Sequence, residues 1–469
     1  MLKKFAKDVI IYGVSSSITK FVGLLLVPVY TRVFSKEDYG TMELIVTIVA
    51  LSTIFGMMQL ESAVARYYYM EKNENDRKTM VSTAMWTIIA VSLLFFLILL
   101  SFSTPLSKIL FNSTIYSTII IIGCLTIPFS NLTAFFSIII QYKKRPVLYL
   151  LFQLLQVTVT ISLTIYLVVF AKIGIVGVFW GQLAGFLSSV IFMVIYLREQ
   201  LGFVWKYNAL NKMMRYSLPL LPAVAGNMAN SHLNRFIMLG YLSLAEIGLY
   251  GVALKISSVF HLISSAFKMA WGPFFWETLE NNPDHRAVFK KVQTELSLLV
   301  LMIVVFVTLF SKEIIFILTT ESYFPAAKLI GLLSLSIALT SIIVPLTGIG
   351  PGITKKTEYN TIIYFLGLTI NIGSLFIIVP AIGLIGVPIS MLLGNITLLI
   401  VGWYNSERLY YVGFKKLPML FNLVATFIII LIDLNFDLPL MVKILVLILL
   451  FVYLIVKYHT KITLLLKKT

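Results

Sequence analysis

The chain has 469 residues, of which 59% are hydrophobic and only 12% are charged, so its composition excludes a water-soluble globular protein. Its formal net charge of +17 could suit a nucleic-acid-binding protein, but about two thirds of its 37 lysines and arginines lie in the termini and in alternate loops. That alternation is the positive-inside pattern of membrane proteins, in which basic residues gather in the cytoplasmic loops. The excess of basic residues therefore indicates the orientation of the spans, and no nucleic-acid partner is expected. The single cysteine, Cys124, excludes an internal disulfide.

Apolar segments long enough to cross a membrane recur along the whole chain. A helix needs about 20 residues to cross the bilayer, and about fourteen segments meet that length. We therefore expect an all-α polytopic membrane protein. The segments are centred near residues 20, 55, 91, 128, 158, 186, 227, 259, 302, 338, 369, 392, 426 and 449.

The basic clusters predict which side of the membrane each end faces. Under the positive-inside rule their side is cytoplasmic, which places both termini in the cytoplasm. The first segment carries Lys20 and lacks a small-residue cleavage site, so it is expected to be a retained helix. Two external loops, 103–116 and 311–326, are long enough for short interfacial helices. The clusters are Lys3/Lys4/Lys7, Lys143/Lys144/Arg145, Lys355/Lys356 and Lys467/Lys468.

A polar stripe runs along the first predicted span. Gly13, Ser16, Ser17, Lys20 and Gly23 recur at intervals of three and four residues, which places them on one helix face. Lys20 lies about 15 Å from either interface, beyond the reach of a lysine side chain. The stripe is expected to line a polar cavity, and a structural ion pair is the alternative for Lys20.

The second predicted span carries acidic and basic side chains. Glu43 and Glu61 lie eighteen residues apart, which is five whole turns of an α-helix, so they are expected to point the same way. Both are candidates for ion or proton coupling. Arg66 lies on a different face, where it either snorkels to the cytoplasmic surface or contributes a cation to a cavity.

The seventh predicted span is the most polar. Asn227, Asn230, Ser231, Asn234 and Arg235 follow helical spacing, and a lipid-exposed face could not carry these groups. Hydrogen bonding between helices is the alternative for the asparagines. The arginine adds a planar guanidinium suited to bidentate phosphate binding.

The eighth predicted span adds two lysines and a histidine. His261 and Lys268 share a helix face, whereas Lys255 lies nearer the outside. Because an imidazole titrates near neutral pH, His261 is a candidate for proton coupling, with a helix-packing role as the alternative.

Two short motifs recur at nearly one offset. Ser35–Gly40 follows the first span and Ser243–Gly248 follows the seventh, while Ile173–Val178 opens the sixth span and Ile382–Val387 opens the twelfth. The offset of about 208 residues covers six spans, an even number, so both copies insert the same way up. This predicts parallel repeats with a binding site between the two halves. The expected domains are an N-lobe (1–205), a C-lobe (206–410) and two additional spans with a tail (411–469).

No catalytic motif accompanies these spans. The sequence has no zinc pattern, no nucleophile elbow and no nucleotide-binding glycine loop with its lysine and hydroxyl. Gly348–Gly352 is glycine-rich but is expected to be a turn at a helix end. We therefore expect a transporter rather than an enzyme, with no cofactor and no metal.

Five cations lie inside otherwise apolar spans. A cation at mid-bilayer costs about 2.5–3.5 kcal/mol, so five facing lipid would cost as much as the stability of a domain. They are expected to face a cavity, and with only two glutamates in the spans the cavity would attract an anion such as a diphosphate. The cations are Lys20, Arg66, Arg235, Lys255 and Lys268, with Ser16, Ser17, Asn227, Asn230 and Asn234 as polar lining.

Three stretches resemble the Wzx-type flippases of polysaccharide repeat units, the polysaccharide transport family. Pro28–Gly40 resembles the signature after the family's first helix, Arg66–Tyr69 the end of its second helix, and Pro219–Trp276 its seventh and eighth helices. The similarity covers nearly the whole chain and is specific for the family but not for the sugar.

The resemblance implies the fold of the multidrug/oligosaccharidyl-lipid/polysaccharide (MOP) superfamily, with two six-helix lobes around a central cavity. It implies an undecaprenyl-diphosphate-linked glycan as cargo, moved to the outer leaflet of the bacterial cytoplasmic (inner) membrane for O-antigen, capsule or exopolysaccharide synthesis. Membrane lipid and a polysaccharide polymerase or co-polymerase are the further partners. The related lipid II flippases are similar, with cavity cations to which Lys20, Arg66 and Lys255 correspond by helix.

The expected mechanism is alternating access, with the headgroup in the cavity and the polyprenyl tail in lipid. A lipid II flippase for peptidoglycan is the closest alternative, because the charge argument is the same. A drug/cation antiporter of the same superfamily would need an acidic cavity. A polysaccharide polymerase or ligase would need a large external catalytic loop.

Overall fold

The computed structural model describes residues 22–450 apart from 357 and 437, together with residue 452. Within that part of the chain every regular element is a helix and no strand occurs. Ten of the helical segments described there are long and apolar enough to cross a membrane. The predicted all-α polytopic class is therefore confirmed.

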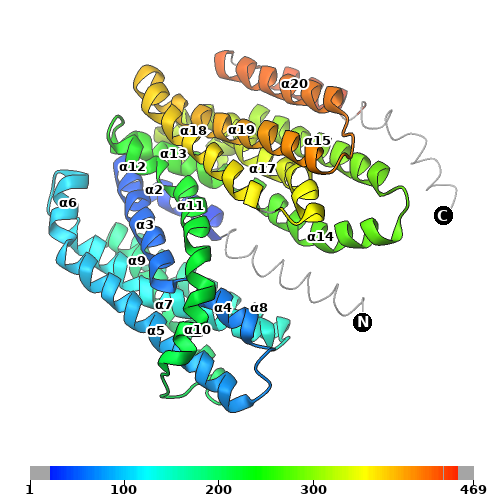
Figure 1. Ribbon diagram of the computed structural model, residues 1–469. Helices are drawn as coiled ribbons and strands as arrows, with labels where there is room; N and C mark the ends of the chain where they lie inside the picture. The colour runs from blue at the N-terminus through cyan, green and yellow to red at the C-terminus, as the bar shows by residue number, and fades with distance from the viewer. Residues whose placement is uncertain (1–21, 357, 437, 451, 453–469) are drawn as a thin grey trace, which may run out of the picture. The chain divides into compact units, whose positions relative to one another are not determined.

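The first half of the chain alternates long spans with short connecting helices (Figure 1). One short helix, α6, lies in the first of the two loops in which we expected one. The bounds are α2 (Val27–Val33), α3 (Lys36–Met57), α4 (Leu60–Tyr67), α5 (Glu74–Ser101), α6 (Ser103–Phe111), α7 (Ser117–Tyr142), α8 (Pro146–Ile165), the π-helical η1 (Tyr166–Phe170), α9 (Ile175–Leu197), α10 (Tyr207–Ser217), η2 (Leu218–Leu220), α11 (Leu221–His232), α12 (Asn234–Leu239) and α13 (Leu244–Ser257).

The second half continues this pattern, and its short helix α16 lies in the second of those loops. Each predicted span centre inside the described residues falls within a helix. A further apolar helix, Leu440–Leu450, follows the last labelled one. The bounds are α14 (Val259–Asn281), α15 (His285–Leu309), α16 (Ser311–Leu318), η3 (Glu321–Ala326), α17 (Ala327–Thr354), α18 (Glu358–Ile382), η4 (Gly383–Ile385), α19 (Gly386–Leu409) and α20 (Lys416–Asn435).

The second predicted span is broken, so one geometric expectation is wrong. Between α3 and α4, Met58 and Gln59 take left-handed backbone conformations with φ of 51° and 55°. Glu43 lies on α3 and Glu61 lies on α4. Because the two helices are not continuous, a spacing of five turns does not align these carboxylates.

The stretch Gly348–Gly352 is helical and forms part of α17, so the expectation of a turn is also wrong. Gly350 lies against the backbone of Ser406 on α19, and its N–H donates to the Ser406 Oγ at 2.9 Å. Small residues allow membrane helices to approach this closely, which explains the glycines without a turn. The chain turns only at Lys355, where φ is 59°.

The chain divides into two compact units. Of the described residues, the first unit contains those up to Lys255 together with Leu368–Ser390, and the second contains the others. In the first, α7 packs against α3, α5 and α9, and α8 packs against α9. Fully buried side chains fill the space between α4, α5, α7, α9 and α10, namely Leu60, Ala84, Ile88, Phe135, Phe136, Ile139, Ile140, Met193, Leu197 and Met213.

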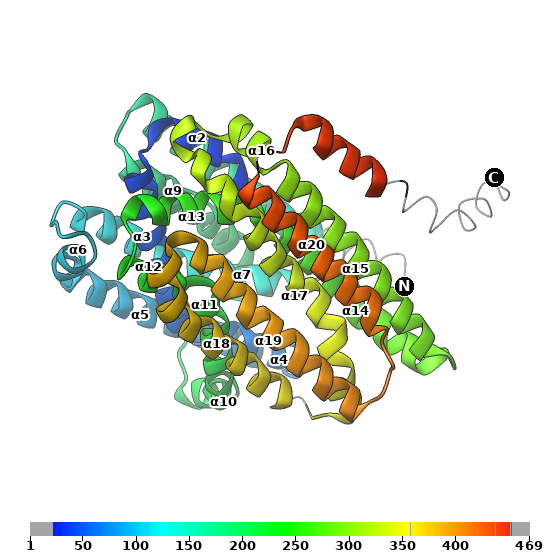
Figure 2. The ribbon, with the colours of Figure 1, turned by 90° about the horizontal axis from the view of Figure 1, so that it is seen from above.

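In the second unit, α15 packs against both α17 and α20, and α14 packs against α17 (Figure 2). Asn395 on α19 donates to the Ser336 carbonyl oxygen at 2.8 Å and to its hydroxyl at 3.0 Å. This buried amide joins α19 to α17. These two units are defined by which residues pack together. The predicted boundaries at residues 205 and 410 were instead placed by the internal repeat, and they stay a prediction.

The two copies of the first repeated motif begin helices in the same way. Ser35 caps α3 by accepting from the Asp38 N–H at 3.1 Å, and its own N–H donates to the Asp38 carboxylate at 3.2 Å. Ser243 and Glu246 form the same reciprocal pair at the start of α13, with distances of 3.3 and 2.9 Å. Both are capping boxes, which satisfy N–H groups that a helix leaves unpaired at its start.

The second repeated motif also has matching backbones. Gly174 precedes α9 with φ of 68°, and Gly383 precedes α19 with φ of 67°. Side chains are disfavoured in this conformation, so glycine is required at both positions. The backbone therefore agrees with the internal repeat that the sequence predicts.

The two capping motifs meet at their last residues. A Cβ on Gly40 would overlap the Leu244 carbonyl oxygen and lie 3.1 Å from the Gly248 nitrogen. A Cβ on Gly248 would overlap the Lys36 carbonyl oxygen and lie 3.1 Å from the Gly40 nitrogen. The contact is reciprocal, so equivalent residues of the two repeats face each other where α3 and α13 begin.

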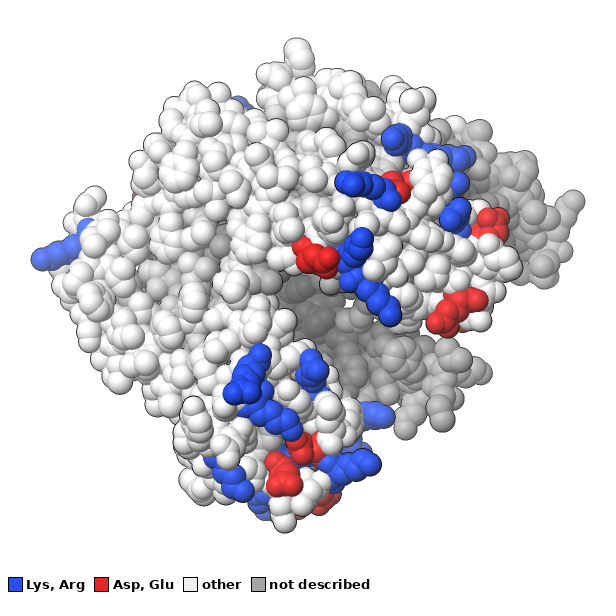
Figure 3. Space-filling model, in the orientation of Figure 1, with Lys and Arg blue, Asp and Glu red and all other residues white. Residues whose placement is uncertain are grey.

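Charged residues gather at one end of the first unit. Figure 3 shows lysines and arginines over the region where Figure 1 places α4, α10 and the start of α5. In the second unit, Lys355 and Lys356 end α17 and Lys415 and Lys416 begin α20. Lys355 and Lys356 form one of the clusters that the sequence predicts to be cytoplasmic. The charges at the end of the first unit include Arg66, Lys72, Arg77, Lys78, Lys212 and Arg215.

We predict that Gly248→Ala destabilises the protein by about 1–3 kcal/mol, because the added methyl group must displace backbone rather than a flexible side chain. Unfolding of the purified chain in detergent measures the change. Gly373→Ala, at a helical glycine of α18 with open space around it, is the matched control. It should be neutral or stabilising by up to about 1 kcal/mol. Equal stability of the two variants would contradict the reciprocal contact.

Candidate functional site

Four of the predicted site residues come together in the first unit: Glu43, Asn234, Arg235 and Lys255. They lie on α3, α12 and α13, which are distant in sequence. We refer to them as the charged cluster.

A buried ion pair joins α3 to α12 inside the charged cluster. Arg235 Nη2 donates to Glu43 Oε2 at 2.6 Å, and the two side chains are 5% and 1% exposed. Removing either charge from water alone costs several kcal/mol, so both are stable here only together. The pair therefore fixes α12 against α3.

Polar and aromatic groups from two further helices surround the ion pair. The Arg235 guanidinium lies 5.8 Å from the centre of the Tyr250 ring on α13, a ring that is fully buried. Asn371 on α18 donates to the Asn234 side-chain oxygen at 3.4 Å. Four helices thus meet around one buried charge pair.

A cavity of about 220 Å³ lies beside Glu43. Its walls come from α2, α3, α8 and α9 and from Lys255 of α13. Pockets for drug-sized ligands begin at roughly 300 Å³, so this cavity suits a hydrated ion or a phosphate-sized group rather than an oligosaccharide. Its polar lining consists of Tyr30, Glu43, Gln156, Thr160, Gln182 and Lys255.

Two glycines leave room for the charged side chains at this cavity. A Cβ on Gly251 of α13 would lie 2.7 Å from the Glu43 Cγ, so the glutamate lies directly over this glycine. A Cβ on Gly23 would lie 3.6 Å from the Lys255 Nζ. Gly23 is the last member of the polar stripe predicted for the first span, and its position at a polar cavity agrees with that expectation.

The charged cluster holds more positive than negative charge. Lys255 and Arg235 both interact electrostatically with Glu43, which is the single carboxylate of the cluster. With one carboxylate against two cations, a net charge of about +1 stays next to the cavity. Such a site favours an anion.

The other residues of the predicted first-span site, Ser16, Ser17 and Lys20, lie outside the described residues. Asn227 and Asn230 lie on α11, which packs against α3. Their helix is therefore in the same unit as the charged cluster.

Arg66 is not part of the charged cluster. It is exposed at the end of α4 and lies 4.4 Å from the centre of the Tyr216 ring on α10. Nearby, Lys143 lies 5.1 Å from the Tyr196 ring, and partial burial lowers the pKa of this lysine. Cations over aromatic rings at a charged end are typical of residues that reach the membrane surface, which favours the snorkelling alternative for Arg66.

Glu61 lies on α4, which packs against α5, α7 and α10. Its Oε2 is buried without a hydrogen-bond partner in the described part of the chain. His261 and Lys268 lie on α14 of the second unit, and both are exposed. The structure thus separates the coupling candidates Glu43, Glu61 and His261 among three helices.

Sequence reasoning missed the partnership within the charged cluster. Glu43 was expected to couple ions and Arg235 to bind substrate, whereas the structure pairs them. The signal was the presence of opposite charges inside apolar spans, since such groups usually pair with one another. With five cations and two glutamates the pattern could not select the partners.

A family described as "Polysaccharide biosynthesis protein" matches residues 29–328. An Lsg locus protein of Haemophilus influenzae is 23% identical over 286 residues, which cover 59% of this chain and 67% of that protein.

Solved structures match over most of the chain. The lipid II flippase MurJ in an inward closed conformation has a TM-score of 0.77 at 15% identity, with 97% of this chain and 100% of that chain covered. An inward-facing multidrug resistance transporter of the MATE family has a TM-score of 0.63 at 16% identity, with 84% and 95% covered. The chain therefore has the fold of the MOP superfamily and is a multi-pass membrane protein.

We predict that Glu43→Gln destabilises the protein by about 3 kcal/mol or more, because it leaves the Arg235 charge buried without its carboxylate. Replacing both residues, in Glu43→Gln/Arg235→Met, should restore most of that loss. Unfolding in detergent compares the variants. Glu71→Gln removes the partner of Lys212 in an exposed pair at 2.5 Å and should change stability by no more than about 1 kcal/mol. An equally small effect at Glu43 would contradict a buried pair.

Proposed function

The chain belongs to the family of polysaccharide biosynthesis proteins, and from that premise we propose that it flips undecaprenyl-diphosphate-linked oligosaccharide repeat units from the cytoplasmic to the outer leaflet. It acts as a transporter and not as an enzyme. The observation that carries the proposal is the net positive charge of the charged cluster, whose Lys255 lines a polar cavity among apolar spans. The family supports the glycan pathway, and the MOP fold supports transport across the membrane.

The diphosphate is the part of the cargo that this charge recognises. Oxygens of a diphosphate accept charge-assisted hydrogen bonds from ammonium groups, and these bonds are about twice as strong as neutral ones. Lys255 makes the first contact, and Lys20 and Lys268 supply further cations. Arg235 acts as a positioning residue, because its charge is neutralised by Glu43 at 2.6 Å.

The glycan requires hydrogen-bonding groups rather than charge. Amides and hydroxyls of the first and seventh spans provide them in this proposal. The residues are Ser16, Ser17, Asn227, Asn230 and Asn234. The cavity of about 220 Å³ in the first unit is too small for an oligosaccharide, so it holds at most a phosphate-sized part of the headgroup.

The transport cycle in this proposal is alternating access in the bacterial cytoplasmic membrane, with both termini in the cytoplasm. The polyprenyl tail stays in lipid while the lobes expose the headgroup first to one side and then to the other. Protonation of Glu61 or His261 resets the carrier. Delivered repeat units pass to a polysaccharide polymerase or co-polymerase.

A lipid II flippase for peptidoglycan is the second candidate, and the observation favouring it is the fold shared with MurJ at a TM-score of 0.77. A drug/cation antiporter is disfavoured by the positive charge of the cluster. The family match to residues 29–328 favours the polysaccharide cargo over both.

Deletion of the gene tests the function directly. We expect lipid-linked repeat units to accumulate in the cytoplasmic leaflet, protected from a membrane-impermeant label and identified by mass spectrometry. Labelled units outside would indicate a defect in polymerisation and contradict the flippase. Accumulation of lipid II alone would support the second candidate.

Substitution of Lys255 tests the role of the charged cluster. Lys255→Gln should slow flipping of a labelled lipid-linked repeat unit in proteoliposomes by about tenfold or more, the effect of losing one charge-assisted hydrogen bond. Lys255→Arg should retain most of the activity because it keeps the charge. Lys108→Gln, on the exposed face of α6, is the control and should have no effect. Normal flipping by a folded Lys255→Gln protein would refute cation binding at this position.

A further inference from the structure

An irregular loop of the first unit lies against a membrane-spanning helix. Residues 201–206 follow α9 and lead into α10, which packs against α4 and α5 (Figure 1). We refer to these residues as the α9–α10 loop. Large aromatic side chains point outward from it: Phe203 is 94% exposed, Trp205 is 51% exposed, and Tyr207, the first residue of α10, is 66% exposed. The surroundings of the loop indicate what these side chains face.

Side chains of α5 form hydrogen bonds with the backbone of the α9–α10 loop. The Gly202 N–H donates to the Ser82 Oγ at 2.9 Å, and the Trp86 indole donates to the Gly202 carbonyl oxygen at 3.0 Å. The Lys206 N–H donates to the Thr83 Oγ1 at 3.1 Å. Ser82 and Thr83 are fully buried. Three backbone groups of an irregular segment are therefore satisfied by the side chains of one span.

The same helix also holds the aromatic side chains of the loop in place. The Trp205 indole donates to the Thr87 Oγ1 at 3.1 Å, and the centres of the Phe203 and Trp86 rings lie 5.5 Å apart. Side chains that are already ordered lose little conformational entropy when they bind a ligand. The exposed aromatic surface of the loop is therefore preformed.

The α9–α10 loop lies along the first apolar turns of α5. No charged residue follows Lys78 in this helix, and the rise from Lys78 to Ser101 is about 35 Å at 1.5 Å per residue. Because the hydrocarbon core of a bilayer is about 30 Å thick, Ser82 and Thr83 are expected near its edge. Lipid offers no hydrogen bonds, so irregular backbone at this depth requires partners within the protein. The hydrogen bonds with α5 provide such partners.

Two lysines lie beside the aromatic surface of the loop. Lys206 is exposed, and a Cβ on Gly202 would lie 3.2 Å from the Lys78 Cε, so the Lys78 side chain lies next to the loop. Neither lysine takes part in an ion pair within the part of the chain that the structure describes. The acidic residues in the first turn of α5, Glu74 and Asp76, precede Lys78. Exposed aromatic rings beside lysines are typical of segments in the headgroup layer of a membrane.

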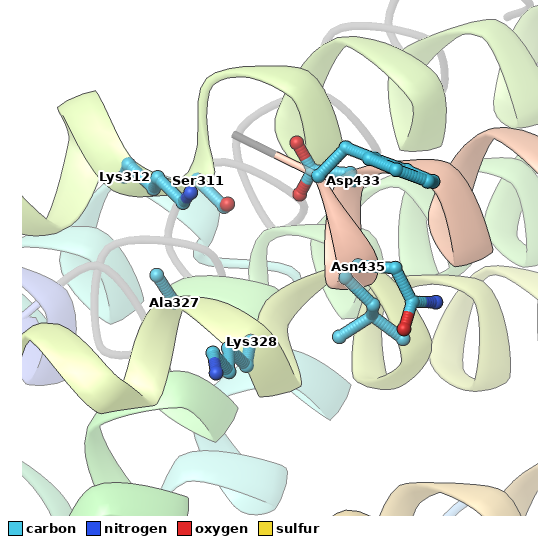
Figure 4. A pocket seen from close by; sticks show the side chains of 8 residues that line it. Ser311, Lys312, Ala327, Lys328, Asp433 and Asn435 are labelled. Atoms are coloured by element: carbon cyan, nitrogen blue, oxygen red, sulfur yellow. The ribbon is translucent and has the colours of Figure 1, made fainter. Parts of the chain in front are cut away.

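A polar pocket of the second unit has a different arrangement of charge. It has a volume of about 170 Å³ and is lined by residues of α16, α17 and the end of α20 (Figure 4). Its Asp433 interacts electrostatically with Lys443 and Lys312. Lys443 also pairs with Glu313 at 2.7 Å. These charges are largely matched within the protein, so the lysines beside the α9–α10 loop are the better candidates for binding an external anion.

We propose that the α9–α10 loop binds an anionic phospholipid of the leaflet next to the start of α5. The headgroup phosphate accepts hydrogen bonds from Lys78 and Lys206, and an acyl chain lies against the Phe203 and Trp205 rings. A zwitterionic headgroup is disfavoured, because its own cation would lie beside two ammonium groups. The transport cycle proposed above does not use this surface, so its failure would leave the flippase function intact.

Fluorescence quenching by nitroxide-labelled lipids tests both the depth of the loop and its choice of lipid. Val204→Cys carries the fluorophore in a Cys124→Ala chain, which has no other thiol and keeps both exposed rings of the loop. The full chain is placed in bilayers of equal amounts of phosphatidylglycerol and phosphatidylcholine, with the nitroxide on the acyl chains of one or the other. We expect phosphatidylglycerol to quench with about fivefold higher apparent affinity, the scale of one lysine near a membrane surface.

Two other fluorophore positions calibrate the measurement. Asn75→Cys, at the exposed start of α5, should be quenched weakly by both lipids, because it lies among the charged residues that precede the apolar turns. Ile428→Cys, on an exposed face of the span α20, should be quenched strongly and equally by both. With the fluorophore at Val204, Lys78→Gln/Lys206→Gln should make the two lipids equal quenchers.

Lys328→Gln is the control for charge, because it removes an exposed lysine from the second unit, and it should leave the preference at Val204 unchanged. Quenching at Val204 as weak as at Asn75 would overturn the proposal, since the loop would then lie in water or beneath another protein. Equal quenching by the two lipids with both lysines present would also overturn it. So would a preference that persists in folded Lys78→Gln/Lys206→Gln protein.

Discussion

The ion pair between Glu43 and Arg235 holds together the part of the first unit in which the candidate site lies. Each charge is more than nine-tenths buried, and neither could stay there without the other. That requirement brings α12 to α3, and it explains why the α13 residue beneath the glutamate is Gly251. The packing of these helices is thus determined by electrostatics as much as by apolar contact.

Once this pair is formed, the function of the site depends on the net charge that lies beside the cavity. Lys255 is a second cation near the Glu43 carboxylate. These two residues are the charged ones that line the cavity, and its other polar groups are neutral. An arginine held by a buried glutamate orients the helices, and a lysine that lines a polar cavity can attract a phosphate. The same residue types in the same spans therefore have different roles, which only their partners distinguish.

The sequence was sufficient for the class of fold, the positions of the spans and the repeat. These rest on local patterns: apolar length, capping residues such as Ser35 and Ser243, and glycines such as Gly174 and Gly383. The break at Met58 and Gln59 could not be predicted, because neither residue favours a left-handed backbone. The pairing in the charged cluster is a contact between residues almost two hundred positions apart, and no local pattern encodes it. Whether Arg66 lines a cavity or reaches the membrane surface depends on its depth in the membrane. The spacing of residues along the sequence does not give that depth.

The reciprocal contact between Gly40 and Gly248 bears on the history of the chain. When equivalent residues of two copies face each other, the contact has the isologous geometry of a twofold-symmetric homodimer. In an ancestor with one copy of the repeat, a single mutation at this position would have altered both sides of the interface at once. After duplication and fusion, each side can change alone, but an enlarged residue on one side still meets backbone on the other. Relatives that replace one of the two glycines should therefore show compensating shifts at the start of the opposite helix.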